Sequence, residues 1–190
     1  MNLVLASASP RRKELLSGMG LNFEVFVSDV DESFDPEIPP GLVPEMLARR
    51  KAEHVSRLKQ GSLIIAADTV VEAAGKILNK PSDAGEAREM LEILSGTVHF
   101  VHTGYCLIGP NGMISGTDTA SVWFRTLKED ELTHYISSGK PFDKAGGYGI
   151  QEWIGLIGVE RIEGSYFTVM GLPSHRIWAG LREMGFPVLV

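Results

Sequence analysis

An aspartate and a threonine follow a run of five apolar residues, and this position is the first candidate for chemistry. Leu63-Ile64-Ile65-Ala66-Ala67 predicts a buried strand, and Asp68-Thr69 then places a carboxylate and a hydroxyl at its carboxyl end. Strand ends of this kind are frequent ligand sites in α/β folds. A carboxylate there can bind a metal or take a proton from water, the two tasks that phosphoanhydride hydrolysis requires. The alternative is an aspartate that caps the following turn.

A second candidate is the segment Ser7-Ala8-Ser9-Pro10-Arg11-Arg12, which follows the first predicted strand. Ser9 can cap a helix whose first position is Pro10. The unpaired amides at a helix start bind anions, and two guanidinium groups stand beside them. The segment therefore predicts an anion site, although a capped helix with solvated arginines has the same pattern. The Gly-x-x-x-x-Gly-Lys-Ser/Thr pattern of the P-loop is missing, so the sequence does not indicate a P-loop ATPase.

Two lysines and a pair of acids could join these segments. Lys51 falls on the apolar stripe of a predicted helix, where it either snorkels to the edge of the core or reaches a phosphate or an acid. Lys80 precedes Pro81, which holds it extended after a strand that pairs with the first. Asp31-Glu32 offers the carboxylate oxygens that magnesium favours, unless both acids are solvated loop charges.

The segment from Pro141 to Gln151 carries three glycines among small and polar residues. This composition indicates a loop whose backbone comes close to a ligand, or a loop with a purely structural role. Gln151 ends it with two donors and an acceptor, which suits the edge of a base. The five histidines show no metal-binding spacing and receive no role, and no Gly-x-Ser-x-Gly pattern suggests acyl transfer.

The elements that position these residues are read from hydrophobic periodicity, which alternates between strand and helix patterns and predicts an α/β or α+β fold with a mixed sheet. Turns at Gly75 and at Pro110-Asn111-Gly112 predict hairpins, and a capping box is expected at Thr126 and Glu129. A mobile acidic loop is expected over 31–41. The predicted strands are Leu3–Ala6, Glu24–Val27, Leu63–Ala67, Val70–Leu78, Val98–Gly109, Ile114–Thr126 and Glu160–Gly164. The predicted helices are Arg11–Met19, Val43–Lys59, Ala84–Leu94, Leu127–Ser138 and Ser174–Met184.

Composition limits the class of protein. A length of 190 residues predicts one domain over residues 1–190, which could be built as two lobes. With 44% hydrophobic and 22% charged residues, the chain has no apolar run long enough to span a membrane, and no signal peptide is expected, so we predict a cytoplasmic protein. The net charge of −6 argues against nucleic acid as a partner. Cys106 is the one cysteine, which excludes an internal disulfide and a cysteine-rich zinc site.

Taken together, the motifs resemble the Maf, or septum-formation-inhibitor-like, nucleotide pyrophosphatases. The resemblance covers nearly the whole chain, with the motifs in the family's order and spacing. The matching segments are Ala6-Ser7-Ala8-Ser9-Pro10-Arg11-Arg12, Asp31-Glu32, Arg50-Lys51-Ala52, Ala67-Asp68-Thr69-Val70, Lys80-Pro81, Ser95-Gly96, Thr103-Gly104, Phe124-Arg125, Asp143-Lys144-Ala145-Gly146, Tyr148-Gly149-Ile150-Gln151 and Gly171-Leu172-Pro173.

The resemblance implies an α/β fold similar to the inosine triphosphate pyrophosphatases, with an elongated mixed β-sheet flanked by helices and two lobes around a central cleft. It implies a divalent metal cation, Mg or Mn, and a nucleoside triphosphate substrate. Asp68 matches the catalytic acid that accepts the proton, and Glu32 would join it at the metal. The positions around the phosphates are Ser7, Arg12, Lys51 and Lys80. A homodimer is plausible by the same resemblance.

Three positions divide the family by substrate, and here they are Arg11, Thr69 and Gln151. They look like the dTTP/UTP branch, since the 7-methyl-GTP branch has Trp, Gln and Glu there. A glutamine amide can meet the alternating donor and acceptor edge of uracil or thymine. The expected function is hydrolysis of dTTP and UTP to the monophosphate and pyrophosphate, with a house-cleaning role on modified pyrimidine nucleotides as a variant. The alternative is a nucleotide-binding regulator of septation whose catalysis is incidental.

Overall fold

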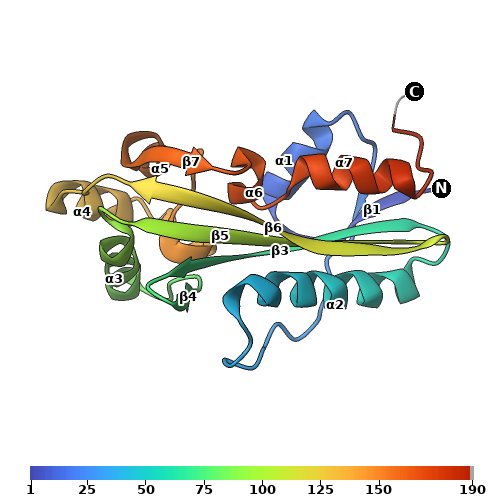
Figure 1. The fold of residues 1–190 in the computed structure, drawn as a ribbon, viewed down its shortest axis with the longest axis horizontal. Coiled ribbons are helices and arrows are strands. Elements are labelled where there is room, and N and C mark those ends of the chain that lie inside the picture. The colour runs from blue at the N-terminus through green and yellow to red at the C-terminus, as the bar shows by residue number, and fades with distance from the viewer. Residues whose placement is uncertain (189–190) are drawn as a thin grey trace. The chain divides into compact units, whose positions relative to one another are not determined.

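The strands form one mixed sheet in the computed structural model, which describes residues 1–188. Within these residues the sheet has seven strands in the order β2-β1-β3-β5-β6-β7, and β4 pairs with β3 (Figure 1). β1 is parallel to β2 and β3, whereas β4 is antiparallel to β3 and β7 to β6. The strands are β1 Leu3–Leu5, β2 Glu24–Val25, β3 Leu63–Ala73, β4 Lys76–Leu78, β5 Val98–Gly109, β6 Gly112–Phe124 and β7 Val159–Glu163. The predicted mixed sheet flanked by helices is confirmed.

The helices begin and end close to the predicted positions where the sequence carries a clear cap. Ser9 accepts a hydrogen bond from the Arg12 amide at the start of α1, and Pro10 is its first residue. Two short helices, α5 and α6, were not predicted, because four to six residues give no periodicity to read. The α-helices are α1 Pro10–Gly18, α2 Val43–Leu58, α3 Ala84–Leu94, α4 Glu129–Ser137, α5 Trp153–Gly158, α6 Tyr166–Val169 and α7 Ser174–Glu183. Short 3-10 turns are η1 Pro40–Leu42, η2 Pro141–Asp143 and η3 Ala145–Gly147.

Two local predictions are wrong. β3 runs without a break from Leu63 to Ala73, so Asp68 lies in the middle of a strand and not at its end. Polar side chains interrupt the apolar pattern there, but backbone pairing continues the strand, because a polar side chain is tolerated wherever it finds a partner. The capping box of α4 is formed by Glu131, whose carboxylate accepts from the Lys128 amide at 2.8 Å, and not by Thr126 and Glu129.

The chain divides into two compact units, which are described separately. Unit 1 comprises residues 1–68, 103–118 and 171–190, and unit 2 comprises residues 69–102 and 119–170. The boundaries fall within β3, β5 and β6, so each of these strands contributes to both units. That residues 1–190 act as a single domain stays a prediction.

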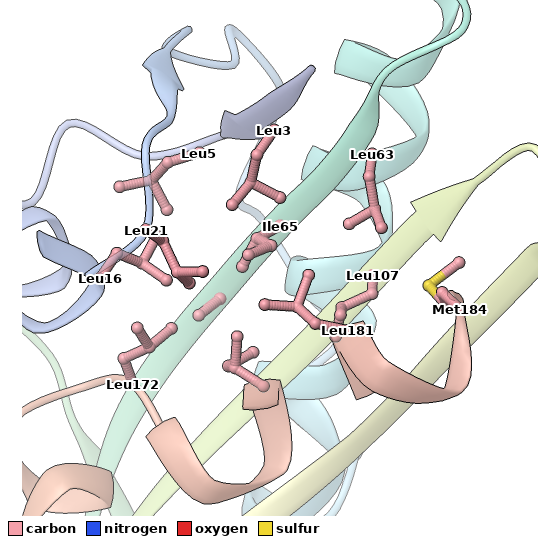
Figure 2. Close-up of a cluster of buried hydrophobic side chains, with 12 residues drawn as sticks. Leu3, Leu5, Leu16, Leu21, Leu63, Ile65, Leu107, Leu172, Leu181 and Met184 are labelled. Atoms are coloured by element: carbon pink, nitrogen blue, oxygen red, sulfur yellow. The ribbon is translucent and has the colours of Figure 1, made fainter. Parts of the chain in front are cut away.

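Unit 1 is a three-layer arrangement with helices on both faces of its part of the sheet (Figure 1). Side chains that alternate along a strand point to opposite faces, and here both faces are buried. Leu3, Leu5, Leu63 and Ile65 pack with residues of α1 and α7, as Figure 2 shows. Their neighbours in the sequence instead pack against α2; they are Val4, Ala6, Ile64 and Ala66. This alternation explains why the strands read as continuous apolar runs.

The start of α2 lies directly on β5 at Gly104. A Cβ atom at this residue would stand 2.1 Å from the carbonyl carbon of Pro44, far inside van der Waals contact. The approach of backbone to backbone therefore requires glycine. It holds α2 close to the sheet face on which Asp68 lies.

Gly104→Ala is expected to destabilise the protein by about 2 kcal/mol or more, because the added methyl group must push α2 away from β5. The matched control is Gly18→Ala at the end of α1, where a Cβ would meet nothing within 4 Å. This control should shift stability by less than about 1 kcal/mol. Urea unfolding of both variants measures the difference, and equal midpoints would contradict the close approach.

Candidate active site

Lys51 and Asp68 form a buried ion pair in unit 1. The Lys51 ammonium donates to Asp68 Oδ1 at 2.5 Å, and the two residues are only 7% and 8% exposed. Asp68 shares the α2 side of β3 with Ile64 and Ala66, because the three positions alternate along the strand. Lys51 belongs to the buried stripe of α2. The lysine thus reaches an acid and does not snorkel to solvent, which selects one of the alternatives that the sequence left open.

Glu32 supplies a second carboxylate to the same lysine. Its Oε1 lies 2.9 Å from the Lys51 ammonium, although Glu32 itself is exposed. Lys51 therefore bridges one acid from the sheet and one from the loop before α2. Of the pair Asp31-Glu32, it is the glutamate that enters the cluster.

Asp31 and Arg50 hold the loop that carries Glu32. Asp31 accepts from the Ser33 amide at 2.8 Å and from the Ser33 hydroxyl at 2.6 Å, and these hydrogen bonds lower the pKa of Asp31. The Arg50 guanidinium donates to the Ser33 carbonyl at 2.6 Å. The turn around Glu32 is thereby tied to α2 by the residue next to Lys51. Sequence reasoning missed this role of Arg50, because the position of a loop carbonyl is defined only in the folded chain.

Arg12 and Ser7 form the cationic side of the cluster. Arg12 Nη1 donates to Ser7 Oγ at 3.1 Å, and Arg12 Nε donates to the Gly171 carbonyl at 2.8 Å. Burial lowers the pKa of the Arg12 guanidinium, the nearby Asp68 carboxylate raises it, and the adjacent Arg11 lowers it again. Two neighbouring guanidinium groups at the start of α1 favour the binding of a negatively charged group there.

The remaining predicted residues belong to unit 2. Thr69 follows Asp68 on β3 and is half-buried, and Lys80 is exposed after β4. Gln151 is half-buried, and its Oε1 atom is buried without a hydrogen-bond partner within residues 1–188. A buried acceptor left in this state costs about 1–3 kcal/mol, so a donor from a ligand would be favoured there.

The glycine-rich loop comes close to its own unit. Gly146 has a φ of 68°, and a Cβ atom there would lie 3.0 Å from the Val71 side chain of β3. The Gly146 amide donates to the Asn79 carbonyl at 3.0 Å, which fixes the loop to the β3–β4 hairpin. Gly146 thus serves packing within unit 2, and the approach of this loop to a ligand stays a prediction.

His99 and His102 lie an odd number of residues apart on β5 and so point to opposite faces, and each has a hydrogen-bonding role in unit 2. His99 Nε2 lies 2.7 Å from the Tyr148 hydroxyl, and the ring packs edge-on to Tyr148 and Phe124. Burial lowers the pKa of His99 to about 4. His102 lies between Glu72, at 2.8 Å, and Thr119, at 2.9 Å.

The donor set around Lys51 suits a hard divalent cation in part. Glu32 and Asp68 offer two carboxylates, and magnesium is commonly bound by one or two carboxylates together with substrate phosphate and water. No group of three or more His, Cys, Asp or Glu side chains that could hold a metal occurs within the described residues. A metal at this place would therefore depend on oxygen atoms from the substrate.

The sequence of this chain is similar to a known protein family. A model of the family described as "Maf-like protein" matches residues 2–184. The chain belongs to the Maf family. The three relatives described next match this chain over 95–98% of their own length.

Three relatives named "dTTP/UTP pyrophosphatase" illustrate the similarity. The protein of Thermococcus gammatolerans is 50% identical over 188 residues, or 98% of each chain. The protein of Thermus thermophilus is 46% identical over 97% of this chain and 95% of its own. The protein of Bacteroides thetaiotaomicron is 44% identical over 96% of this chain and 95% of its own.

Among solved structures, the Maf fold of this chain resembles that of Ham1 proteins. The Coxiella burnetii HAM1 protein has a TM-score of 0.55 at 14% identity and covers 96% of this chain and 99% of its own. The Staphylococcus aureus Ham1 protein has a TM-score of 0.53 at 15% identity, with 95% and 100% covered. At this identity the likeness concerns the fold alone, and it agrees with the fold class expected from the sequence.

Within residues 1–188, no helix combines the length and the apolar character needed to cross a bilayer. The cytoplasmic location and the homodimer expected from the sequence stay predictions.

His99 should make the stability of the protein depend on pH. Its pKa is about 4 when folded against 6.5 when exposed, so between these values the unfolded chain binds the extra proton. The contribution of neutral His99 is complete above pH 6.5 and is lost as the pH falls toward 4, by roughly 3 kcal/mol in all. His99→Gln should flatten this part of the curve in urea unfolding between pH 7 and 4.5. His134→Gln, at an exposed position, is the matched control for the substitution itself.

Proposed function

We propose that this Maf-like protein hydrolyses UTP and dTTP to the monophosphate and pyrophosphate. The observation that carries the proposal is the position of Lys51, whose ammonium contacts both Asp68 and Glu32. Arg12 and Ser7 extend the same cluster. The names of relatives that are 44–50% identical support the choice of substrate. The family match over residues 2–184 supports treating the chain as one catalytic domain.

In the proposed reaction, water attacks the α-phosphorus, the new O–P bond forms and the bond to the bridging oxygen breaks. Pyrophosphate leaves with the electron pair of that bond, and Asp68 takes the proton of the water. Lys51 holds Asp68 Oδ1, so we assign proton transfer to Oδ2. Arg12, Lys51, Lys80 and Ser7 hold the phosphate charge, which grows on the leaving group.

A divalent cation, Mg or Mn, would polarise the phosphate oxygens when bound. In this chain its protein ligands would be Glu32 and Asp68, the carboxylates that Lys51 now pairs. Arg50 and Asp31 would keep Glu32 in place through the Ser33 turn.

For the base, we propose that Gln151 reads uracil and thymine, with Arg11 and Thr69 completing the selection. The buried Gln151 Oε1 would accept from the N3–H group of the base, and the amide nitrogen would donate to a ring carbonyl. Cytosine presents an acceptor at N3 and an amino group at C4, so it offers the opposite pattern. Uracil and thymine share the N3–H donor and the neighbouring carbonyl acceptors, so one site would accept both UTP and dTTP.

Asp68→Asn should lower kcat for UTP and dTTP by about 100- to 10,000-fold, because the amide cannot take the proton. The fold should persist, since an amide oxygen still accepts from Lys51. Pyrophosphate release in the presence of Mg or Mn measures the effect. The exposed Asp29, changed to Asn, is the matched control. Wild-type rates in the Asp68 variant would refute its role.

Gln151→Glu should lower kcat/KM for UTP and dTTP by roughly 10- to 100-fold, because the carboxylate cannot donate to the base and faces a carbonyl. A panel with CTP, 5-methyl-UTP and 7-methyl-GTP tests the reading of the base. The exposed Gln60, changed to Glu, serves as the control. Equal wild-type rates on every nucleotide of the panel would remove the role of Gln151.

A further inference from the structure

The loop that ends in Gln151 is closed at its two ends by a buried ion pair. The Lys144 ammonium lies 3.0 Å from Glu152 Oε1, and the Lys144 side chain is only 6% exposed. The same ammonium contacts Asp143 and donates to the Lys140 carbonyl at 2.6 Å. Residues 144 and 152 are thus joined across the segment that contains the glycines and Gln151.

Gln151 lies in a turn that Glu152 completes. The Glu152 amide donates to the Gly149 carbonyl at 3.0 Å, so Gln151 is the third residue of a four-residue turn. The Leu156 amide donates to the Glu152 carbonyl at 2.9 Å, which joins the turn to the start of α5. The backbone on the carboxyl side of Gln151 is therefore fixed at Glu152 by hydrogen bonds in two directions.

Tyr135 connects this turn to α4. Its hydroxyl donates to Glu152 Oε2 at 2.9 Å, so the two oxygens of Glu152 have different partners. Burial raises the pKa of Tyr135, and the Glu152 carboxylate raises it further, so the hydroxyl keeps its proton. The carboxylate of Glu152 is therefore held in one orientation by Lys144 and Tyr135.

We propose that Lys144, Glu152 and Tyr135 are positioning residues for Gln151, and that their network determines the preference for uracil and thymine over cytosine. The inference rests on the proposed function. A glutamine amide discriminates between donor and acceptor edges only when its own rotation is restricted, because a freely turning amide presents either group. Since the buried Gln151 Oε1 atom has no hydrogen-bond partner within residues 1–188, the orientation of the amide depends on the backbone turn that carries it, which Glu152 closes.

The network contacts the loop that carries Gln151, whereas the proposed chemical step is assigned to Asp68, so loss of the network should alter base selection more than the chemical step. A network that merely supports the fold would instead lower the activity on all nucleotides alike. The ratio of kcat/KM for UTP to that for CTP separates these two roles.

The test uses two conservative variants of the full chain, Tyr135→Phe and Glu152→Gln. The first removes one hydroxyl, and the second removes the charge that pairs with Lys144. Each should lower kcat/KM for UTP and dTTP by about tenfold, mainly through KM, and change the value for CTP by less than about twofold. The kcat at saturating UTP should stay within about twofold of the wild type.

The matched control is Glu129→Gln. Glu129 also pairs with a cation in unit 2, at 2.5 Å from Arg88, but its side chain is 73% exposed. Its UTP to CTP ratio should equal that of the wild type. Calorimetric binding of UTP and CTP to Asp68→Asn, with and without Tyr135→Phe, gives a second readout that does not depend on turnover.

An unchanged UTP to CTP ratio in both variants overturns the inference, while the proposed function stands as long as the wild type hydrolyses UTP. A wild-type protein that does not hydrolyse UTP overturns both. If Glu152→Gln fails to fold, Tyr135→Phe and the binding measurements still decide, because Tyr135→Phe deletes a single oxygen atom.

Discussion

The buried ammonium of Lys51 is the interaction on which the arrangement of unit 1 depends. Removing a charge from water costs on the order of several kcal/mol, which only well-placed partners can offset. Asp68 supplies the nearer partner from β3, and Glu32 supplies the other from a surface loop. Three separate parts of the chain must therefore meet at one point: the sheet, α2 and the acidic loop. The packing of these three parts therefore also determines the geometry of the candidate site.

The approach of α2 to the sheet is what allows this meeting. The absence of a side chain at Gly104 lets the first turn of α2 rest on β5. The apolar stripe of α2 covers Val4, Ile64 and Ala66, and Lys51 lies on this same buried stripe. Opposite it, α1 and α7 close the other face over Leu5 and Ile65. The ion pair of Lys51 and Asp68 thus lies within an otherwise apolar interface between α2 and the sheet.

In unit 2, the corresponding network surrounds the turn that carries Gln151, the residue proposed to read the base. Lys144 and Tyr135 fix Glu152, and the turn from Gly149 to Glu152 carries Gln151 between them. Ion pairs that are exposed contribute little, whereas a buried one restricts geometry strongly. In the proposed function, the charged groups of unit 1 would hold the phosphates, and the hydrogen-bonding groups of unit 2 would meet the base.

By itself, the sequence determined the fold class and the approximate bounds of most elements, and it supplied the candidate site residues as predictions. Caps and periodicity are local, so α1 and α3 could be predicted from Ser9, Pro10 and the apolar spacing of α3. The motifs likewise indicated Asp68 and Lys51 in advance.

Only the tertiary structure decided how these residues are used. The sequence could not tell that β3 continues through Asp68, because strand pairing depends on neighbours distant in the chain. Nor could it tell a snorkelling Lys51 from a paired one, or assign Arg50, Tyr135 and Glu152 to their loops. Partners 17 to 19 residues apart, as in Lys51–Asp68, Tyr135–Glu152 and Arg50–Asp31, are chosen by packing in three dimensions, and no local pattern encodes that choice.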